Sequence, residues 1–312
     1  MKQLQKVASR RFGQYNVVRR LGEGGMAVVY LAEAVDERGN MIPVALKFMK
    51  PRVDAPGVDA SDLFAVEGDV MGLLRHPSLV NLYEVGKLGE TMYFAMEYCP
   101  GGDLEALISA LRWQDKPFPP SVALQIGIDL LKALAYVHQA QGVRGTSLGL
   151  VHGDINPANI FVSLDESRPK LGDFGVVTSS VLGTGLPEGA AAGKLHYLSP
   201  EQAQGKPLTA QSDLFALGVV MFELLLGRKP FDGPDAETII ERICAGRYDL
   251  PSHVSDPLAS VFEKALARNP RSRFPSAGAF AGDLLRYQLE TGLQESPRAL
   301  RDLAEEALQI LA

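Results

Sequence analysis

The stretch that decides the fold is His152-Gly153-Asp154-Ile155-Asn156-Pro157-Ala158-Asn159-Ile160-Phe161. It is followed, after a short apolar and charged segment, by Asp173-Phe174-Gly175. Carboxylate and amide oxygens are hard ligands that suit Mg²⁺. Each of these short motifs is common when taken alone, so its interpretation depends on what else the chain carries and in which order.

A glycine-rich loop lies far upstream, in Leu21-Gly22-Glu23-Gly24-Gly25-Met26-Ala27-Val28-Val29-Tyr30. Glycines allow backbone N–H groups to approach phosphate oxygens, because no Cβ stands in the way. A glycine-rich hairpin turn would look the same. The apolar strand Val44-Ala45-Leu46-Lys47 follows, and a lysine at such a position is by default an exposed charge at the edge of a sheet. A lysine after a phosphate loop indicates instead a contact with the phosphates of a nucleotide.

With these motifs in this order, the chain resembles the protein kinase family, and most closely the bacterial eukaryotic-like serine/threonine kinases, over Phe12–Leu289. The resemblance implies an α+β, bilobal fold with ATP in the cleft between the lobes. We expect an N-terminal extension (1–11), a small β-rich lobe of five strands and one helix (12–97), a larger helical lobe (98–290) and a helical tail (291–312). The hydrophobic periodicity agrees with this division. Strand patterns such as Met41–Phe48, and a helical pattern over Asp62–Leu74, precede Pro100-Gly101-Gly102, and helical patterns such as Ala236–Ala245 follow it.

The resemblance also implies an ATP site and a Mg²⁺ site. Lys47 is expected to hold the α- and β-phosphates and to pair with Glu67. The hinge between the lobes would use the Glu97 carbonyl and the Cys99 N–H for adenine, with Met96 at the back pocket and Asp103 near the ribose. Asn159 and Asp173 are the expected metal ligands. The implied ATP-binding residues are Leu21, Gly22, Gly24, Gly25, Val29, Ala45, Lys47, Glu67, Met96, Glu97, Cys99, Asp103 and Phe161.

Asp154 is the implied catalytic residue, which accepts the proton of the substrate hydroxyl or orients that hydroxyl for attack. His152 is interpreted as a core histidine that supports the loop. Two residues near Asp154 depart from the pattern of the family. Gly153 replaces an arginine that usually receives a phosphorylated activation loop. Asn156 replaces a lysine that usually neutralises the transferring phosphoryl group.

Lys194 is a third departure, since it stands where serine/threonine kinases usually have a threonine. We hypothesise that the positive charge has moved from position 156 to position 194. A lysine stem is long enough to bring its ammonium near Asp154, and Asn156 is expected to hydrogen-bond to it. The plain alternative is a lysine that points to solvent.

The C-terminal half favours a protein as the substrate. Ser199-Pro200-Glu201 resembles the end of an activation segment, with Arg273 as the expected partner of Glu201. Asp213 resembles the helix-start aspartate that anchors the catalytic loop. We therefore expect phosphorylation of serine or threonine in proteins, with autophosphorylation or dimer formation as further expectations. An ATP-binding pseudokinase is the first alternative and a small-molecule kinase of the aminoglycoside or choline type is the second.

Composition sets the remaining limits. The 312 residues carry a net charge of −6, which argues against nucleic acid as the main partner. Two cysteines far apart argue against a disulfide framework and for a reducing compartment. The N-terminus lacks the apolar run of a signal peptide. The apolar stretch Leu214–Leu226 is too short to span a bilayer and predicts a buried core helix. We expect a cytoplasmic protein without a membrane segment.

Overall fold

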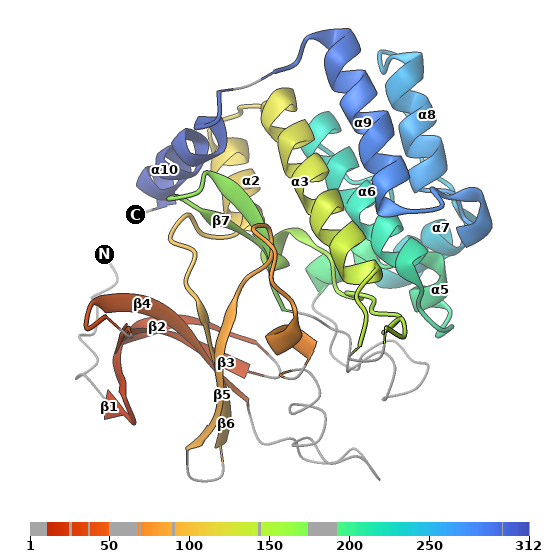
Figure 1. Cartoon of the computed structure of the whole chain (residues 1–312). Helices are drawn as coiled ribbons and strands as arrows, with labels where there is room; N and C mark the ends of the chain where they lie inside the picture. Colours follow the sequence, from red (N-terminus) through yellow and green to blue (C-terminus); the bar gives the residue numbers. More distant parts are fainter. Residues whose placement is uncertain are drawn as a thin grey trace. The chain divides into compact units, whose positions relative to one another are not determined.

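The computed structural model of the chain describes residues 11–24, 27–36, 38–49, 68, 70–88, 91–142, 145–173, 192–294 and 296–311. These residues form two compact units. The first comprises the chain up to Arg75 together with Val80–Tyr98, and the second comprises His76–Leu79 and the chain from Cys99 onward. The first unit is an antiparallel sheet and the second is mainly helical (Figure 1), which confirms the predicted β-rich region followed by a helical one.

The sheet of the first unit has six strands in the order β1-β2-β3-β4-β6-β5, so the expected number of five was wrong. The additional strand pairs Arg11 with Asn16 and Phe12 with Tyr15. It forms because Gly13 has a φ of 56°, a left-handed conformation that glycine adopts without strain and that reverses the chain. The strands are β1 (Arg11–Phe12), β2 (Tyr15–Glu23), β3 (Ala27–Val35), β4 (Met41–Met49), β5 (Leu82–Leu88) and β6 (Thr91–Glu97).

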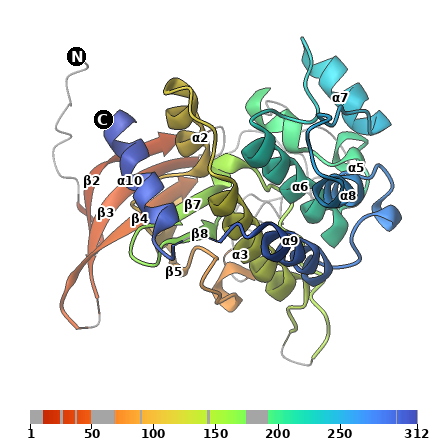
Figure 2. The ribbon, with the colours of Figure 1, turned by 90° about the horizontal axis from the view of Figure 1, so that it is seen from above.

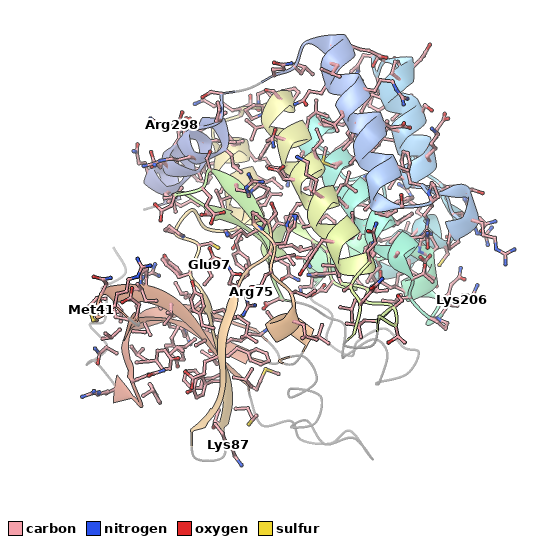
Figure 3. The ribbon with its side chains drawn as sticks, in the orientation of Figure 1. Met41, Arg75, Lys87, Glu97, Lys206 and Arg298 are labelled. Carbon is pink, nitrogen blue, oxygen red and sulfur yellow. The ribbon has the colours of Figure 1, made fainter. Side chains whose placement is uncertain are left out.

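The core of this sheet lies on one face, because side chains alternate along a strand. Val44 and Leu46 of β4 are buried there with Val17, Ala32 and Ala95. The opposite face therefore carries the odd-numbered side chains of β4. Figure 3 labels Met41 and Lys87, which lie at different ends of the sheet. Of the helix expected over Asp62–Leu74, the described residues 68 and 70–73 are helical, and Leu74 lies just beyond the helix. Residues 62–67 and 69 lie outside the described residues.

The helical unit is built around α3 (Pro120–His138) and α6 (Ala210–Leu226), which pack against each other (Figures 1 and 2). α6 is buried along most of its length, which confirms the core helix predicted from Leu214–Leu226. At Gly218 a Cβ would lie 2.8 Å from the Cβ of Ala265, so glycine is what allows α6 and α8 (Asp256–Ala265) to approach so closely. The other helices of this unit are α2 (Leu104–Trp113), α5 (Pro200–Ala203), α7 (Ala236–Ala245), α8 (Asp256–Ala265), α9 (Ala277–Thr291) and α10 (Ala299–Leu311).

α3 is the one described helix that is long and apolar enough to cross a membrane by length and composition. In the structure, 72% of the apolar 18-residue stretch of α3 is buried inside the protein, mainly against α6 and α9. A helix that is apolar all round is expected in the core of a large helical unit. Its composition is therefore accounted for by its packing.

Two strands of the helical unit were also not predicted. β7 (Ile160–Ser163) and β8 (Arg168–Leu171) form a hairpin that begins at the end of the stretch His152–Phe161. Each has only four residues, and β8 contains a proline and two basic residues, so neither has a recognisable alternation. Lys170 is nevertheless almost completely buried and pairs with Glu166 at 3.1 Å.

α10 confirms the helix predicted in the tail, and it packs on α2 and β7 (Figure 2). Its inner face buries Leu300 and Leu303, whereas Leu311 is 53% exposed.

We expect Leu300→Ala to lower the free energy of unfolding by about 2–5 kcal/mol, because it removes buried methyl groups and leaves a cavity. Leu311→Ala is the matched control and should change it by less than about 0.5 kcal/mol. Thermal unfolding of both variants measures this, and equal effects would contradict the packing of α10.

Candidate active site

The stretch His152–Phe161, called the catalytic stretch from here on, is anchored by Asp213 in the first turn of α6. Its carboxylate accepts a hydrogen bond from the His152 N–H and another from the Gly153 N–H, both at 2.8 Å. His138, at the end of α3, places its Nε2 2.8 Å from the same carboxylate. Asp213 is 1% exposed, and its three hydrogen bonds satisfy a charge that would otherwise be costly to bury. The anchor predicted for Asp213 is confirmed, whereas His138 was missed.

His152 is completely buried, which confirms its interpretation as a core histidine. Its Nε2 lies 3.0 Å from the Gly172 carbonyl, and its Nδ1 accepts from the Asp154 N–H at 3.3 Å. This pattern requires a neutral ring with the proton on Nε2. Burial lowers the pKa of His152 below its ordinary value and so favours the same neutral form. The histidine therefore holds the loop.

Gly153 has a φ of 77°, in the left-handed region that favours glycine. Its carbonyl accepts from Gln202 Nε2 at 2.8 Å, so α5 also holds the loop from the other side. Gln202 was not predicted as a site residue, although it directly follows the Ser199-Pro200-Glu201 motif. A glycine at this position gives the loop its shape without backbone strain.

The Asp154 carboxylate is held by three side chains. Oδ1 accepts from Asn156 Nδ2 at 3.0 Å. Oδ2 accepts from Asn159 Nδ2 at 2.8 Å and from Lys194 Nζ at 2.7 Å. The carboxylate is 37% exposed, so a substrate hydroxyl can reach it. Contrary to our expectation, Asn156 bonds to Asp154 and not to Lys194: its Nδ2 donates to Asp154, and its Oδ1 accepts from the Ala158 N–H.

The two expected metal ligands have a chemistry that fits Mg²⁺. The amide nitrogen of Asn159 donates to the Asp154 carboxylate and carbonyl, so its amide oxygen is the atom available to a metal. Asp173 has a φ of 54°, a sparsely populated conformation for a residue with a side chain. Such outliers cluster at functional sites, where the surrounding structure maintains them. Mg²⁺ commonly takes one or two protein ligands and completes its shell with water and phosphate oxygens.

The first unit holds the candidate phosphate-binding residues in adjacent strands. Val29 is the register partner of both Gly22 on β2 and Lys47 on β4. Ala45, on the same face of β4 as Lys47, is the register partner of Met96 on β6. Directly opposite residues on one face have Cβ atoms about 4.5–5.5 Å apart. The strand pairing therefore brings Gly22, Val29 and Lys47 together, as a phosphate site needs.

The turn after β2 closes with a hydrogen bond from the Gly24 N–H to the Ala27 carbonyl at 2.9 Å. Leu21 belongs to the same strand, β2. Gly25, Glu67 and the Phe174-Gly175 pair lie outside the described residues. The Lys47–Glu67 pair therefore stays a prediction.

Two of the residues expected to contact adenine and ribose have defined hydrogen-bond partners. In the first unit, the Glu97 side chain accepts from the side-chain Nδ2 of Asn81 at 2.8 Å and from the Asn81 backbone N–H at 3.2 Å. In the second unit, the Asp103 side chain caps α2 by accepting from the Ala106 N–H at 2.8 Å, and burial raises the pKa of Asp103. Asp103 also forms an isolated bridge with Phe161. Cys99 is buried, and neither it nor Cys244 is in a disulfide.

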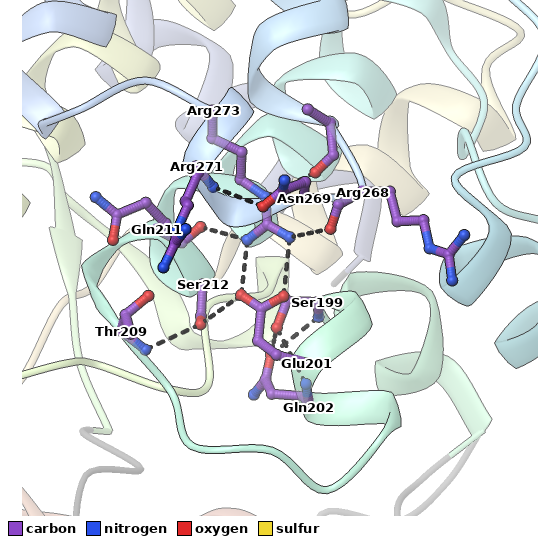
Figure 4. Close-up of polar contacts among 11 residues, drawn as sticks. Ser199, Glu201, Gln202, Thr209, Gln211, Ser212, Arg268, Asn269, Arg271 and Arg273 are labelled. Atoms are coloured by element: carbon purple, nitrogen blue, oxygen red, sulfur yellow. Dashed lines mark hydrogen bonds and ion pairs between the residues drawn. The ribbon is translucent and has the colours of Figure 1, made fainter.

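The Glu201–Arg273 pair is confirmed and is buried. Two guanidinium nitrogens of Arg273 donate to the two carboxylate oxygens of Glu201, at 2.6 and 2.8 Å (Figure 4). Ser212 donates to Glu201 at 2.6 Å. Arg273 also donates to the carbonyls of Ala267, Arg268 and Gln211. The pair joins the segment around α5 to the start of α6 and to the loop before η3 (Pro270–Ser272).

Comparison with known proteins matches the sequence model described as the protein kinase domain to residues 15–283. The chain is 36% identical over 287 residues to the serine/threonine-protein kinase PrkC of Bacillus subtilis, covering 89% of this chain and 41% of that protein. It is 33% identical over 300 residues to the serine/threonine-protein kinase PknB of Mycobacterium leprae (93% and 45%). It is 31% identical over 288 residues to the tyrosine-protein kinase MasK of Myxococcus xanthus (91% and 44%). The chain spans less than half the length of these three relatives.

Proposed function

Because this chain belongs to the protein kinase family, we propose that it transfers the γ-phosphate of ATP to serine and threonine hydroxyls of proteins. The single observation that carries the proposal is the geometry of Asp154. Its carboxylate is partly exposed, held by two asparagine amides, and placed on a loop that the buried Asp213 anchors. A carboxylate fixed in this way can orient a hydroxyl and accept its proton.

We assign the other roles from the residues that each unit supplies. Lys47 and the glycine-rich turn hold the phosphates of ATP. Asn159 and Asp173 hold Mg²⁺, which supplies positive charge to the phosphates when it is bound. Such catalysis consists of positioning and charge neutralisation, which needs no covalent intermediate with the protein.

A protein substrate is favoured over a small molecule by the buried Glu201–Arg273 pair. The pair gives the segment around α5 a rigid support inside the helical unit. By the resemblance described above, this segment is the platform for a peptide. Serine and threonine are favoured as acceptors because the relatives PrkC and PknB are named serine/threonine kinases, although MasK is named a tyrosine kinase.

The test is incubation of the chain with radiolabelled ATP, Mg²⁺ and a generic protein such as casein, followed by acid hydrolysis and separation of the phosphoamino acids. We expect phosphoserine and phosphothreonine, and no label above background with the Asp173→Ala variant, which lacks a metal ligand. Label on tyrosine would mean that the acceptor is a tyrosine hydroxyl and not serine or threonine. Mg²⁺-dependent ATP binding without any transfer would favour the pseudokinase, and label on an aminoglycoside or choline alone would favour the small-molecule kinase.

A further inference from the structure

The catalytic stretch of this chain contains no lysine and no arginine between His152 and Phe161. Phosphoryl transfer spreads negative charge over the oxygens of the transferring group, and positive groups near these oxygens stabilise the transition state. Asn156 supplies no charge, and both ends of its amide are in use. Its Nδ2 donates to Asp154, and its Oδ1 accepts from the Ala158 N–H at 3.1 Å, which caps η1 (Pro157–Asn159).

A positive charge from another segment of the helical unit lies next to Asp154. Lys194 lies in η2 (Ala192–Tyr197), and its Nζ is 2.7 Å from Asp154 Oδ2. The ammonium carries three donors. Asp154 is the one partner that the structure gives it among the described residues. The Lys194 side chain is 43% exposed, so the remaining donors can turn toward a bound ligand.

The ion pair is not required to place the Asp154 carboxylate. Asn156 already holds Oδ1 and Asn159 already holds Oδ2. The pair also contributes little to folding, because partly exposed ion pairs contribute about 0–1 kcal/mol. Neither the position of Asp154 nor the stability of the fold therefore accounts for a lysine at position 194.

We propose that Lys194 supplies the positive charge that neutralises the transferring phosphoryl group, and this rests on the proposed phosphotransferase function. In that step the oxygen of the acceptor hydroxyl forms a bond to the γ-phosphorus. The bond from the γ-phosphorus to the bridging oxygen breaks, and ADP leaves with the electron pair. The hydroxyl proton passes to Asp154. An ammonium within hydrogen-bond distance of Asp154 stands next to the attacking oxygen, and thus next to the phosphoryl group that this oxygen attacks.

The test compares Lys194→Thr, Lys194→Arg, Asn156→Lys and the double variant Asn156→Lys/Lys194→Thr. We expect Lys194→Thr to lower kcat about 100-fold while KM for ATP changes less than about threefold, because the lost interaction belongs to the transition state. Lys194→Arg should keep at least about a tenth of kcat, since the charge is retained. The double variant should recover most of the loss, a non-additive result for two residues that share one role.

A second readout does not depend on turnover. ADP with aluminium fluoride imitates the transferring phosphoryl group, so Lys194→Thr should weaken binding of this complex about 10-fold or more and leave binding of ADP alone unchanged. Lys206→Thr is the matched control, because Lys206 is an exposed lysine of the same unit, after α5 (Figure 3). Lys206→Thr should change neither the affinity for ADP–aluminium fluoride nor the affinity for ADP.

Two outcomes would overturn the proposal. Lys194→Thr with wild-type kcat and wild-type affinity for ADP–aluminium fluoride would mean that the charge is not used. A variant faster than wild type would mean that Lys194 blocks Asp154. If the wild-type chain transfers no phosphate at all, the proposed function fails. The binding experiment still decides the role of Lys194 in that case. Weaker binding of ADP–aluminium fluoride alone by Lys194→Thr would support the proposed role, and binding equal to that of wild type would contradict it.

Discussion

Asp154→Asn is expected to lower kcat for phosphoryl transfer about 10³-fold, within the range of about 10²–10⁴ for a positioned general base. The substitution keeps the shape of the side chain but replaces one carboxylate oxygen by a donor. That donor would face the nitrogens of Asn156, Asn159 or Lys194, all of which now donate to Asp154. The side chain could then neither accept the substrate proton nor keep all three hydrogen bonds.

Binding of ATP should survive the same substitution, because the residues assigned to the phosphates and to Mg²⁺ are untouched. Steady-state kinetics and equilibrium binding of ATP, measured on the same preparation, separate the two effects. Asp165→Asn is the matched control, since Asp165 is an exposed aspartate in the turn between β7 and β8. Its kcat should equal that of wild type. An Asp154→Asn variant with more than about a hundredth of wild-type kcat would contradict the assignment, because a general base contributes at least about 10²-fold.

Arg273→Met is expected to lower the free energy of unfolding by about 3–5 kcal/mol, the cost of leaving a buried charge without its partner. The Arg273 side chain is fully buried and satisfies both oxygens of Glu201. Arg271→Met is the control, because Arg271 lies two positions earlier and is exposed, and it should cost less than about 0.5 kcal/mol. Replacing Glu201 by methionine as well should restore part of the loss, since no orphan charge remains.

The cost of Arg273→Met should also depend on pH. Burial by itself raises the pKa of Glu201, but the hydrogen bonds from Arg273 and Ser212 outweigh it and hold the pKa below the ordinary value of 4.5. In the wild type, the ionised Glu201 therefore contributes its full share to the free energy of unfolding above pH 4.5. This share is lost as the pH falls through the lowered pKa of Glu201. In the variant burial dominates and raises the pKa, so Glu201 takes up a proton as the pH falls. The difference in unfolding free energy between wild type and Arg273→Met should narrow from pH 7 toward pH 4 in denaturant titrations. A constant difference would contradict this assignment.

Much of the fold was predictable because it depends on local patterns. The alternation in Met41–Phe48 and the helical spacing in Ala236–Ala245 predicted β4 and α7 closely. β7 and β8 were missed, since four residues with a proline and buried Lys170 carry no periodicity. β1 was missed because its two residues are held by the turn at Gly13 and by pairing with β2.

By itself, the sequence determined the order of the motifs and pointed to the residues to which we assign the chemistry, including Lys47, Asp154, Asn159 and Asp173. Only the tertiary structure decided which of the other polar residues act on them. Lys194 reaches Asp154, and His138 reaches Asp213, from segments far apart in the chain. The reason is physical: a helix or strand depends on neighbours a few residues away, whereas the burial of a charge and the choice of its partner depend on how distant segments pack.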